Sequence, residues 1–382
     1  MISSLSWRAS RCLAVLLIMA AAISGCGVST ISDPTPFPAA TVTAINSAIT
    51  KWFSEYQAPG VIVGIWIPGQ GTYVSAQGKA DLATGEPMQI DDHVRIGSIT
   101  KTFTVTVLLQ LVEQGRMGLD DPVSKYVSYI PNGQNITLRM LANMTSGLFS
   151  YTEDDTFVND LLSNPEQVWT PSQLLDIAIA HPPYFAPGTG FHYSNTNTVL
   201  LGVIIEQVTG KDICDVYNEE NFTPLGLTNT VCPTSSALPV PYAHGITQQT
   251  LNGEVADATN WNPSWAFTAG ELISNLQDLK VWVKAYTTGA QISPALQQQR
   301  LTWVPESTSE RGYGLGIGYD HGWLGHEGGL PGYNSEAQYL PAEDATIVIL
   351  VNSDIPHDGN TPAAGLLHDL AQIVTPNNVP DP

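Results

Sequence analysis

Segments typical of β-strands lie near both ends of this 382-residue chain, and the part between them is mostly helical in character. Two such runs, 61–67 and 72–77, are separated by Gly69-Gln70-Gly71, which predicts a hairpin. Two more, 335–340 and 345–352, lie near the C-terminus. Because strands must pair, this distribution predicts one antiparallel sheet built from both ends of the chain, with a helical lobe inserted between them. The expected fold class is α/β, of the α+β kind.

Helix-like segments flank these strands. Apolar side chains recur at helical spacing from Val42 to Tyr56, which predicts an amphipathic helix before the hairpin. Residues 102–114 are apolar on most sides and are followed by Gly115, a pattern typical of a buried helix that ends at a glycine. A last helix is expected over about 361–374.

Composition excludes two broad classes of protein. Charged residues make up only 13% of the chain and hydrophobic residues 43%, which excludes a disordered polyelectrolyte. The formal net charge is −21, from 14 basic and 35 acidic residues, so no basic stripe exists to displace counterions from phosphates. No nucleic-acid partner is expected.

The first 25 residues have the pattern of a secretory signal. Arg8 and Arg11 precede an apolar run, 13–23, which is shorter than the roughly 20 residues of a membrane span. The following Ser24-Gly25-Cys26 completes a motif that resembles a bacterial lipobox, in which the cysteine becomes the lipidated first residue. Plain cleavage near Gly25 is the alternative.

We therefore predict a signal peptide over 1–25, a lipid on Cys26 and a proline-rich, lipid-anchored tether over 26–40. The protein is then expected to be exported and held by its N-terminal lipid on the outer face of the bacterial cytoplasmic membrane.

Two cysteines remain after such processing, Cys214 and Cys232. Export places them where disulfides form, so a bridge is predicted, with two free thiols as the alternative. The eight histidines show no His-x-x-x-His beside a carboxylate, and the chain has no Cys-x-x-Cys. No metal and no cofactor are expected.

Ser98-Ile99-Thr100-Lys101 is the first candidate for chemistry. Residues three apart on a helix share a face, so the hydroxyl and the ammonium would be neighbours, and a desolvated lysine can activate a serine. Among the seven lysines only Lys101 has a serine three positions before it. The alternative is an N-cap serine followed by a surface lysine.

Two further motifs lie downstream. Tyr193-Ser194-Asn195 follows a Pro-Gly loop and opens an apolar run, where a phenol can move protons and an amide can orient a substrate; a buried tyrosine beside a capping asparagine is the alternative. His326-Glu327-Gly328-Gly329 lies in a glycine-rich stretch. Consecutive glycines on a strand indicate close approach of a backbone or ligand, whereas a loop that needs positive φ is the alternative.

In this order and spacing the three motifs resemble those of the serine β-lactamase and D-alanyl-D-alanine carboxypeptidase superfamily. The chain is most similar to the branch with class C β-lactamases, D-aminopeptidases and related esterases, where the second motif is Tyr-x-Asn and the third is sometimes His-x-Gly. Two supporting stretches also match, Leu119–Val123 and Thr145–Leu148. The resemblance covers about 42–375 and implies a β-lactamase/transpeptidase-like fold.

The resemblance also implies a role for each motif residue. Ser98 would be the nucleophile, Lys101 and Tyr193 would together act as general base, and Tyr193 would protonate the leaving group. Asn195 would position the substrate amide. The backbone N–H groups of Ser98 and Gly329 would form the oxyanion hole, each worth about 2.7–4 kcal/mol.

The third motif departs from the family pattern. His326 replaces a frequent lysine, and its cationic form is expected to assist Tyr193 or the substrate. Glu327 replaces a Thr or Ser that helps to hold a substrate carboxylate, so Glu327 and Gly328 are candidate substrate-binding residues with altered specificity. An outward-pointing Glu327 is the alternative.

We therefore expect one catalytic domain over 41–375, with a sheet lobe at about 41–104 and 266–375, a helical lobe at about 105–265 and a C-terminal tail over 376–382. The leading hypothesis is a cell-envelope acyl-serine hydrolase, a D-Ala-D-Ala carboxypeptidase or related D-amino-acid peptidase, acting on a peptide or small molecule. The alternatives are an esterase, a β-lactamase and a catalytically silent penicillin-binding lipoprotein.

Overall fold

The computed structural model describes residues 35–305 and 307–382, and Thr35–Pro382 forms one compact unit. The predicted signal peptide, the lipidation site Cys26 and the first part of the tether lie outside the described residues.

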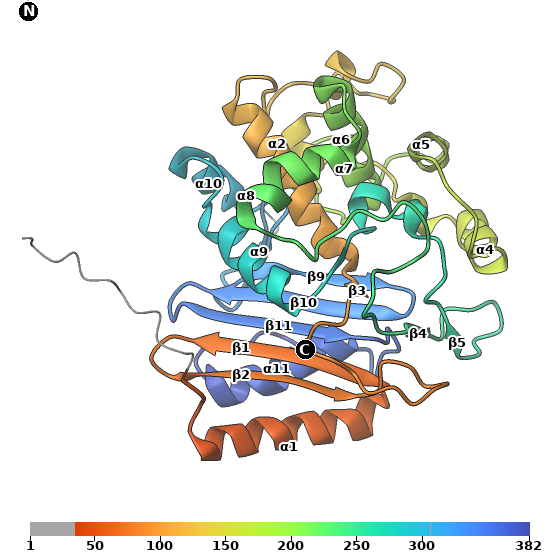
Figure 1. Cartoon of the computed structure of the whole chain (residues 1–382). Helices are drawn as coiled ribbons and strands as arrows, with labels where there is room; N and C mark the ends of the chain where they lie inside the picture. Colours follow the sequence, from red (N-terminus) through yellow and green to blue (C-terminus); the bar gives the residue numbers. More distant parts are fainter. Residues whose placement is uncertain (1–34, 306) are drawn as a thin grey trace, which may run out of the picture. The chain divides into compact units, whose positions relative to one another are not determined.

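A seven-stranded antiparallel sheet forms the centre of this unit (Figure 1). Its order is β2-β1-β11-β10-β9-β8-β7, so a hairpin from the N-terminal part pairs with strands from the C-terminal part, which confirms the predicted sheet. The strands are β1 (Gly60–Ile67), β2 (Gly71–Gly78), β7 (Arg311–Tyr313), β8 (Gly318–Asp320), β9 (Trp323–Leu330), β10 (Tyr333–Leu340) and β11 (Ala345–Val351). Two short pairs lie outside it: β3 (Val94–Arg95) with β6 (Ile273–Ser274), and β4 (Ile246–Thr247) with β5 (Ala256–Asp257).

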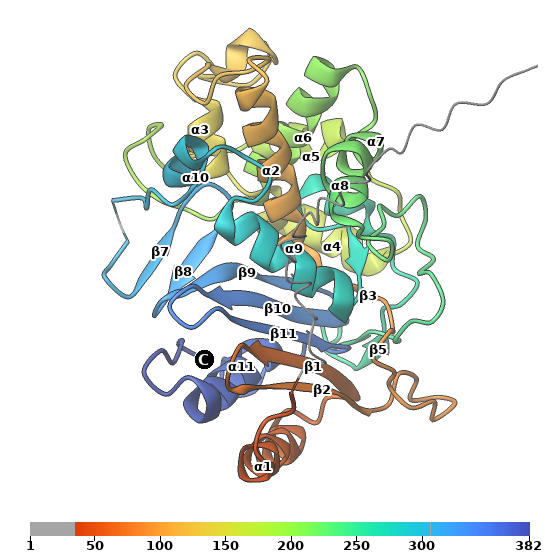
Figure 2. The ribbon, with the colours of Figure 1, turned by 60° about the vertical axis from the view of Figure 1, so that its left-hand side comes forward.

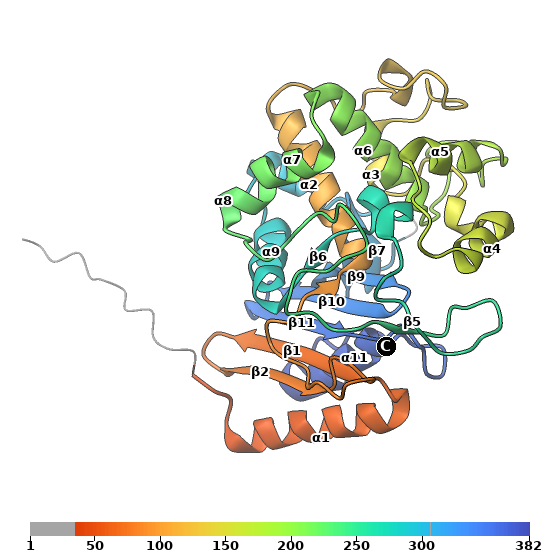
Figure 3. The same cartoon turned by 45° about the vertical axis from the view of Figure 1, so that its right-hand side comes forward.

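Helices cover both faces of the sheet. Figure 2 shows α1 (Ala39–Tyr56) and α11 (Pro362–Val374) on one face, and both helices lie where the sequence predicts a helix. The opposite face carries α9 (Leu276–Thr288) and the helical lobe, which Figure 3 shows stacked above the strands. The remaining helices are α2 (Thr100–Glu113), α3 (Leu138–Ala142), α4 (Asp155–Ser163), α5 (Pro171–Ile179), α6 (Asn195–Thr209), α7 (Ile213–Tyr217), α8 (Thr223–Leu225) and α10 (Pro294–Arg300).

The central strand β11 is apolar throughout because both of its faces are covered. Ile347 and Ile349 pack in the cluster formed with α1 and α11, whereas Val348 and Leu350 pack in the larger cluster formed with the helical lobe. Alternate side chains of a strand point to opposite faces, so a continuous apolar run is what such a position requires.

Two segments differ from the sequence-based expectation, the end of the tether and the C-terminal tail, and residues 314–317 form a turn that was not predicted. Residues 314–317, where glycines alternate with larger residues, form a turn between β7 and β8, with Gly316 at a φ of 61°. The last part of the tether is not free: Phe37 is buried, and the backbone around it bonds Thr72. The C-terminal tail also joins the fold, because the Trp323 indole donates to the Asn378 carbonyl at 2.8 Å.

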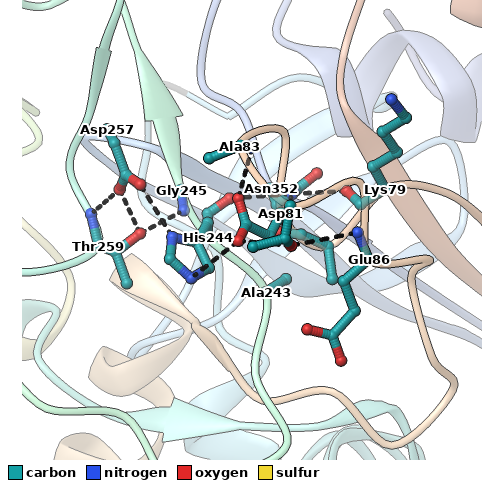
Figure 4. A network of polar contacts seen from close by, with 12 residues as sticks. Lys79, Asp81, Ala83, Glu86, Ala243, His244, Gly245, Asp257, Thr259 and Asn352 are labelled. Atoms are coloured by element: carbon teal, nitrogen blue, oxygen red, sulfur yellow. Dashed lines mark hydrogen bonds and ion pairs between the residues drawn. The ribbon is translucent and has the colours of Figure 1, made fainter.

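A polar network ties the inserted region to the sheet (Figure 4). Asn352, at the end of β11, donates to the carbonyl oxygens of Lys79 at 3.1 Å and His244 at 2.9 Å. Nδ1 of His244 lies 2.8 Å from a carboxylate oxygen of Asp257, and Thr259 bonds the other oxygen of that carboxylate. These contacts fix the loop before β4 against the edge of the sheet.

Within the described part of the chain, no helix has both the length and the apolar character needed to span a membrane.

Candidate active site

Ser98 lies in a 3₁₀ turn, Gly97–Ile99, that leads directly into α2. Gly97 has a φ of 51°, and a Cβ on it would lie 2.5 Å from the backbone nitrogen of Gly329 in β9. Only glycine permits both the conformation and the contact. The turn therefore brings the start of α2 against β9 and presents Ser98, which is partly exposed, at the junction.

Lys101 lies one helical turn further on and is fully buried. Its Nζ is 2.7 Å from the Ser98 hydroxyl oxygen and 2.7 Å from the carbonyl oxygen of Ala269. Burial lowers the pKa of Lys101 well below its usual value, and the nearby Glu327 opposes this only in part. A neutral amine next to a serine hydroxyl is able to accept its proton.

Tyr193 precedes α6 and faces the same point. Its ring centroid lies 4.9 Å from Lys101 Nζ. The hydroxyl is buried and has no hydrogen-bond partner among the described residues. Burial raises the pKa of Tyr193 well above 10, so the phenol stays protonated and is suited to donate a proton. The expected sharing of the base role with Lys101 is therefore not favoured by this geometry.

Asn195 is the first residue of α6, and its side chain bonds a different segment. Its amide nitrogen donates to the Thr152 hydroxyl at 3.0 Å, and its backbone N–H donates to Ser150 at 3.2 Å. The two hydrogen bonds of Lys101 Nζ join it to Ser98 and Ala269. Asn195 thus holds the loop at Ser150 against α6, and no hydrogen bond joins it to Lys101.

His326 is buried in β9 beside Tyr193, with 6.1 Å between the ring centroids. Nδ1 lies 2.6 Å from the Glu327 carbonyl oxygen, and Nε2 lies 3.0 Å from the hydroxyl of Tyr313. Burial, together with Lys101, lowers the pKa of His326 to about 4. The structure therefore corrects the expected cationic role: the ring is neutral, donates from Nδ1 and accepts the Tyr313 proton at Nε2.

The glycines of the third motif have different surroundings. A Cβ on Gly328 would lie 1.9 Å from the Ile96 carbonyl oxygen, whereas one on Gly329 would meet only Asn334, at 3.9 Å. β8 pairs with β9 as far as Gly325, so from His326 onward the edge of β9 that faces away from β10 has no strand partner among the described residues. This edge lies beside Ser98 and is open to an extended substrate.

Glu327 faces the opposite side of β9 from His326 and is exposed. Its cross-strand partner is Glu336 in β10, which is only 4% exposed. Burial and the neighbouring Glu327 raise the pKa of Glu336 to about 8. Sequence reasoning missed both Glu336 and Tyr313, because neither belongs to a motif. The available signal was only their position beside the glycine-rich stretch.

The cysteine pair and one cluster of acidic side chains lie away from Ser98 and do not contact it. Cys214 and Cys232 form a disulfide with 5.6 Å between their Cα atoms, so the predicted pairing is present. Asp320, His321 and Asp381 come within 4.8 Å of one another, and Arg311 pairs with both aspartates. The chain itself supplies the cation at that cluster, which gives a metal ion little to add.

The fold and the arrangement of Ser98, Lys101 and Tyr193 are of the β-lactamase type. The sequence model of the family described as "Beta-lactamase" matches residues 37–372, and the chain belongs to that family.

Several known proteins are similar to this chain in sequence or structure. A D-aminopeptidase of Brucella anthropi is 27% identical over 315 residues, which cover 81% of this chain and 59% of the relative. A D-stereospecific amidohydrolase from a Streptomyces species is 34% identical with a TM-score of 0.77, covering 86% of this chain and 97% of that one. A D-amino acid amidase from Ochrobactrum anthropi SV3, solved with L-phenylalanine amide, is 26% identical with a TM-score of 0.77, covering 88% and 97%. The chain spans about three fifths of the length of the curated relatives it matches.

Proposed function

We propose that the protein is an acyl-serine amidohydrolase that cleaves amide bonds on the carbonyl side of D-amino acid residues, as a D-amino-acid peptidase or amidase of the bacterial cell envelope. The observation that carries this proposal is the 2.7 Å contact between a buried lysine and the Ser98 hydroxyl at the open edge of β9. The related D-aminopeptidase and D-stereospecific amidohydrolase support the substrate class. The envelope location rests on the lipobox-like segment that ends at Cys26.

In the proposed acylation step Ser98 Oγ attacks the amide carbonyl carbon and Lys101 takes the hydroxyl proton. The tetrahedral oxyanion is held by the backbone N–H groups of Ser98 and Gly329, which the packing of Gly97 against β9 brings close together. Tyr193 then gives its proton to the leaving nitrogen and regains one from Lys101 as the C–N bond breaks.

Deacylation uses the same groups in reverse order. Lys101 takes a proton from a water molecule that attacks the ester carbonyl carbon, and the Ser98 oxygen leaves with a proton. The products are a carboxylic acid and an amine, and the enzyme returns to its starting state. The neutral His326 holds Tyr313 next to Tyr193 and transfers no proton in this cycle.

A substrate panel tests the proposal on the processed protein. D-phenylalanine amide, L-phenylalanine amide, a D-Ala-D-Ala peptide, a nitrophenyl acetate and benzylpenicillin are compared by kcat/KM, with Ser98→Ala as the matched control. We expect the D-amide to be cleaved at least tenfold faster than the L-amide and the variant to be inactive. Turnover of the ester with no amide hydrolysis would support an esterase, and preferred cleavage of D-Ala-D-Ala would support the carboxypeptidase.

A further inference from the structure

A cavity of about 460 Å³ begins at the candidate active site and extends away from Ser98. Tyr193 and His326 line one end of it. It continues past the edge of β9 to the face of the sheet on which Glu327 and Glu336 lie. The groups proposed to move protons therefore share one continuous space with two carboxyl groups.

The two carboxyl groups lie next to each other on the sheet, and no lysine or arginine forms an ion pair with either of them among residues 35–305 and 307–382. Glu327 and Glu336 are direct cross-strand partners, so their side chains lie on the same face, an arrangement that destabilises a sheet when both are charged. Only 4% of Glu336 is exposed. Its Oε2 accepts a hydrogen bond from Gln338 at 2.7 Å, whereas its Oε1 has no hydrogen-bond donor among residues 35–305 and 307–382. A nearly buried glutamate thus lines the cavity with one carboxyl oxygen that has no hydrogen-bond donor among the described residues.

The cations nearby have other partners. Arg311 is the one lysine or arginine among the residues that line the cavity, and it lies 3.3 Å from carboxylate oxygens of both Asp320 and Asp381. Lys101 bonds Ser98 and Ala269. Because the pKa of Glu336 is raised to about 8, this acid is mostly protonated at neutral pH when it has no positive partner. A positive group from outside the protein would favour its carboxylate form and pair with it.

The position of Tyr193 shows which part of a substrate would enter. In the proposed function Tyr193 protonates the leaving nitrogen, so the leaving group departs on the Tyr193 side, where the cavity begins. The acyl part stays at Ser98 and along the open edge of β9.

We propose that this cavity is the leaving-group subsite and that Glu327 and Glu336 bind an ammonium group carried by the leaving amine. The substrate class is then a D-aminoacyl amide whose amine portion bears a second, positive amino group, such as a diamine or the amino group of a basic residue. This inference rests on the proposed function. It also explains why a glutamate lies at the nearly buried position 336.

Three substrates that differ only in the end of the leaving group test the inference. They are the D-phenylalanyl amides of 1,3-diaminopropane, butylamine and β-alanine, whose leaving groups are similar in length and are cationic, neutral and anionic. We expect the diamine derivative to be cleaved with a kcat/KM at least tenfold above that of the butylamide, and the β-alanine derivative to be the poorest substrate.

Variants assign the preference to the two acids. Glu336→Gln and Glu327→Gln should each lower the cation-to-neutral ratio of kcat/KM at least fivefold, since the amide keeps the shape and removes the charge. Glu254→Gln, which changes an exposed carboxylate outside the cavity, should leave the ratio unchanged. The ratio compares two substrates on one protein, so it is independent of the fraction of each variant that folds.

The possible failures are distinguishable. If the wild-type protein cleaves none of the three amides, the proposed function is wrong and the inference falls with it. If the neutral amide is cleaved but the diamine derivative shows no preference, or the preference persists in both variants, the inference is overturned while the function stands.

Discussion

The Tyr313 hydroxyl lies 3.0 Å from Nε2 of His326, in a ring whose Nδ1 lies 2.6 Å from a backbone carbonyl oxygen. A carbonyl oxygen only accepts, so Nδ1 carries a proton and donates it. Burial lowers the pKa of the ring to about 4, so near neutral pH Nε2 has no proton and accepts the one of the Tyr313 phenol. His326 is thus an uncharged group that positions Tyr313 beside Tyr193.

The neutral ring predicts a particular pH dependence. Because the pKa of His326 is lowered to about 4, activity should not fall as the pH rises through 6.5, the ordinary imidazole range. NMR titration of the His326 ring should show one neutral tautomer down to about pH 5. A descending limb near pH 6.5 that Tyr313→Phe shifts would mean that the cationic ring takes part.

The same group affects stability in a defined direction. The folded pKa of His326 lies below that of the unfolded chain, so unfolding takes up a proton at acid pH. The contribution is intact above about pH 6.5 and is lost as the pH falls toward 4. His326→Gln should therefore show a shallower loss of unfolding free energy over this range in urea titrations, and equal slopes would contradict the assignment.

Lys101 should reduce stability while it supports activity. Burial lowers its pKa, so at pH 7 unfolding lets the amine take up a proton, which favours the unfolded state. Lys101→Met should lose at least a thousandfold in kcat/KM yet unfold at higher denaturant concentration at pH 7, by about 1–2 kcal/mol. That gain should shrink as the pH approaches 10.5. A variant that is less stable at both pH 7 and pH 9.5 would contradict the account.

The two glycines of the third motif give a matched pair of variants. Gly328→Ala places a Cβ against the Ile96 carbonyl oxygen and should cost more than about 3 kcal/mol or move β9 away from the start of α2. Gly329→Ala places its Cβ in open space and should change stability by less than about 0.5 kcal/mol. Thermal unfolding of both variants checks this, and equal costs would show that the contact with Ile96 is not the constraint.

Glu327 should disfavour substrates that carry a carboxylate near the scissile bond. Two negative charges about 4 Å apart repel by ~4 kcal/mol at an effective dielectric constant near 20. Glu327→Thr should raise the rate of acylation by benzylpenicillin at least tenfold and leave a small neutral ester almost unaffected, as measured by stopped-flow mixing. No gain with penicillin would mean that the exposed carboxylate lies away from the bound ligand.

The sequence allowed the fold to be predicted where its patterns were local and repeated. Strand-like runs near the two ends located β1, β2, β10 and β11, and the spacing of Ser98 and Lys101 located a helix start. The turn at 314–317 was not predicted, because Gly316 serves both that turn and a close approach to Val105 of α2. Neither the turn nor the contact with Val105 can be recognised from the residue types alone.

The site was predictable as far as its motifs extend. Ser98, Lys101, Tyr193 and His326 converge, but the charge state of His326 depends on burial and on Tyr313, thirteen residues earlier in the chain. The place of Glu336 in the site could not be predicted for a similar reason. Its meaning comes from the register that places it opposite Glu327, and pairing register is a tertiary property that a single strand does not reveal.

The central claim is that Ser98 forms an acyl-enzyme in a reaction that requires Lys101, and its most direct test is the intact mass of the protein after rapid mixing with a D-phenylalanine ester, followed by peptide mapping. The account predicts one added D-phenylalanyl group on the peptide that contains Ser98, no adduct in Ser98→Ala, and an adduct that forms at least a thousandfold more slowly in Lys101→Met. Hydrolysis of the ester with no adduct on Ser98, or an adduct that persists in Ser98→Ala, would contradict it.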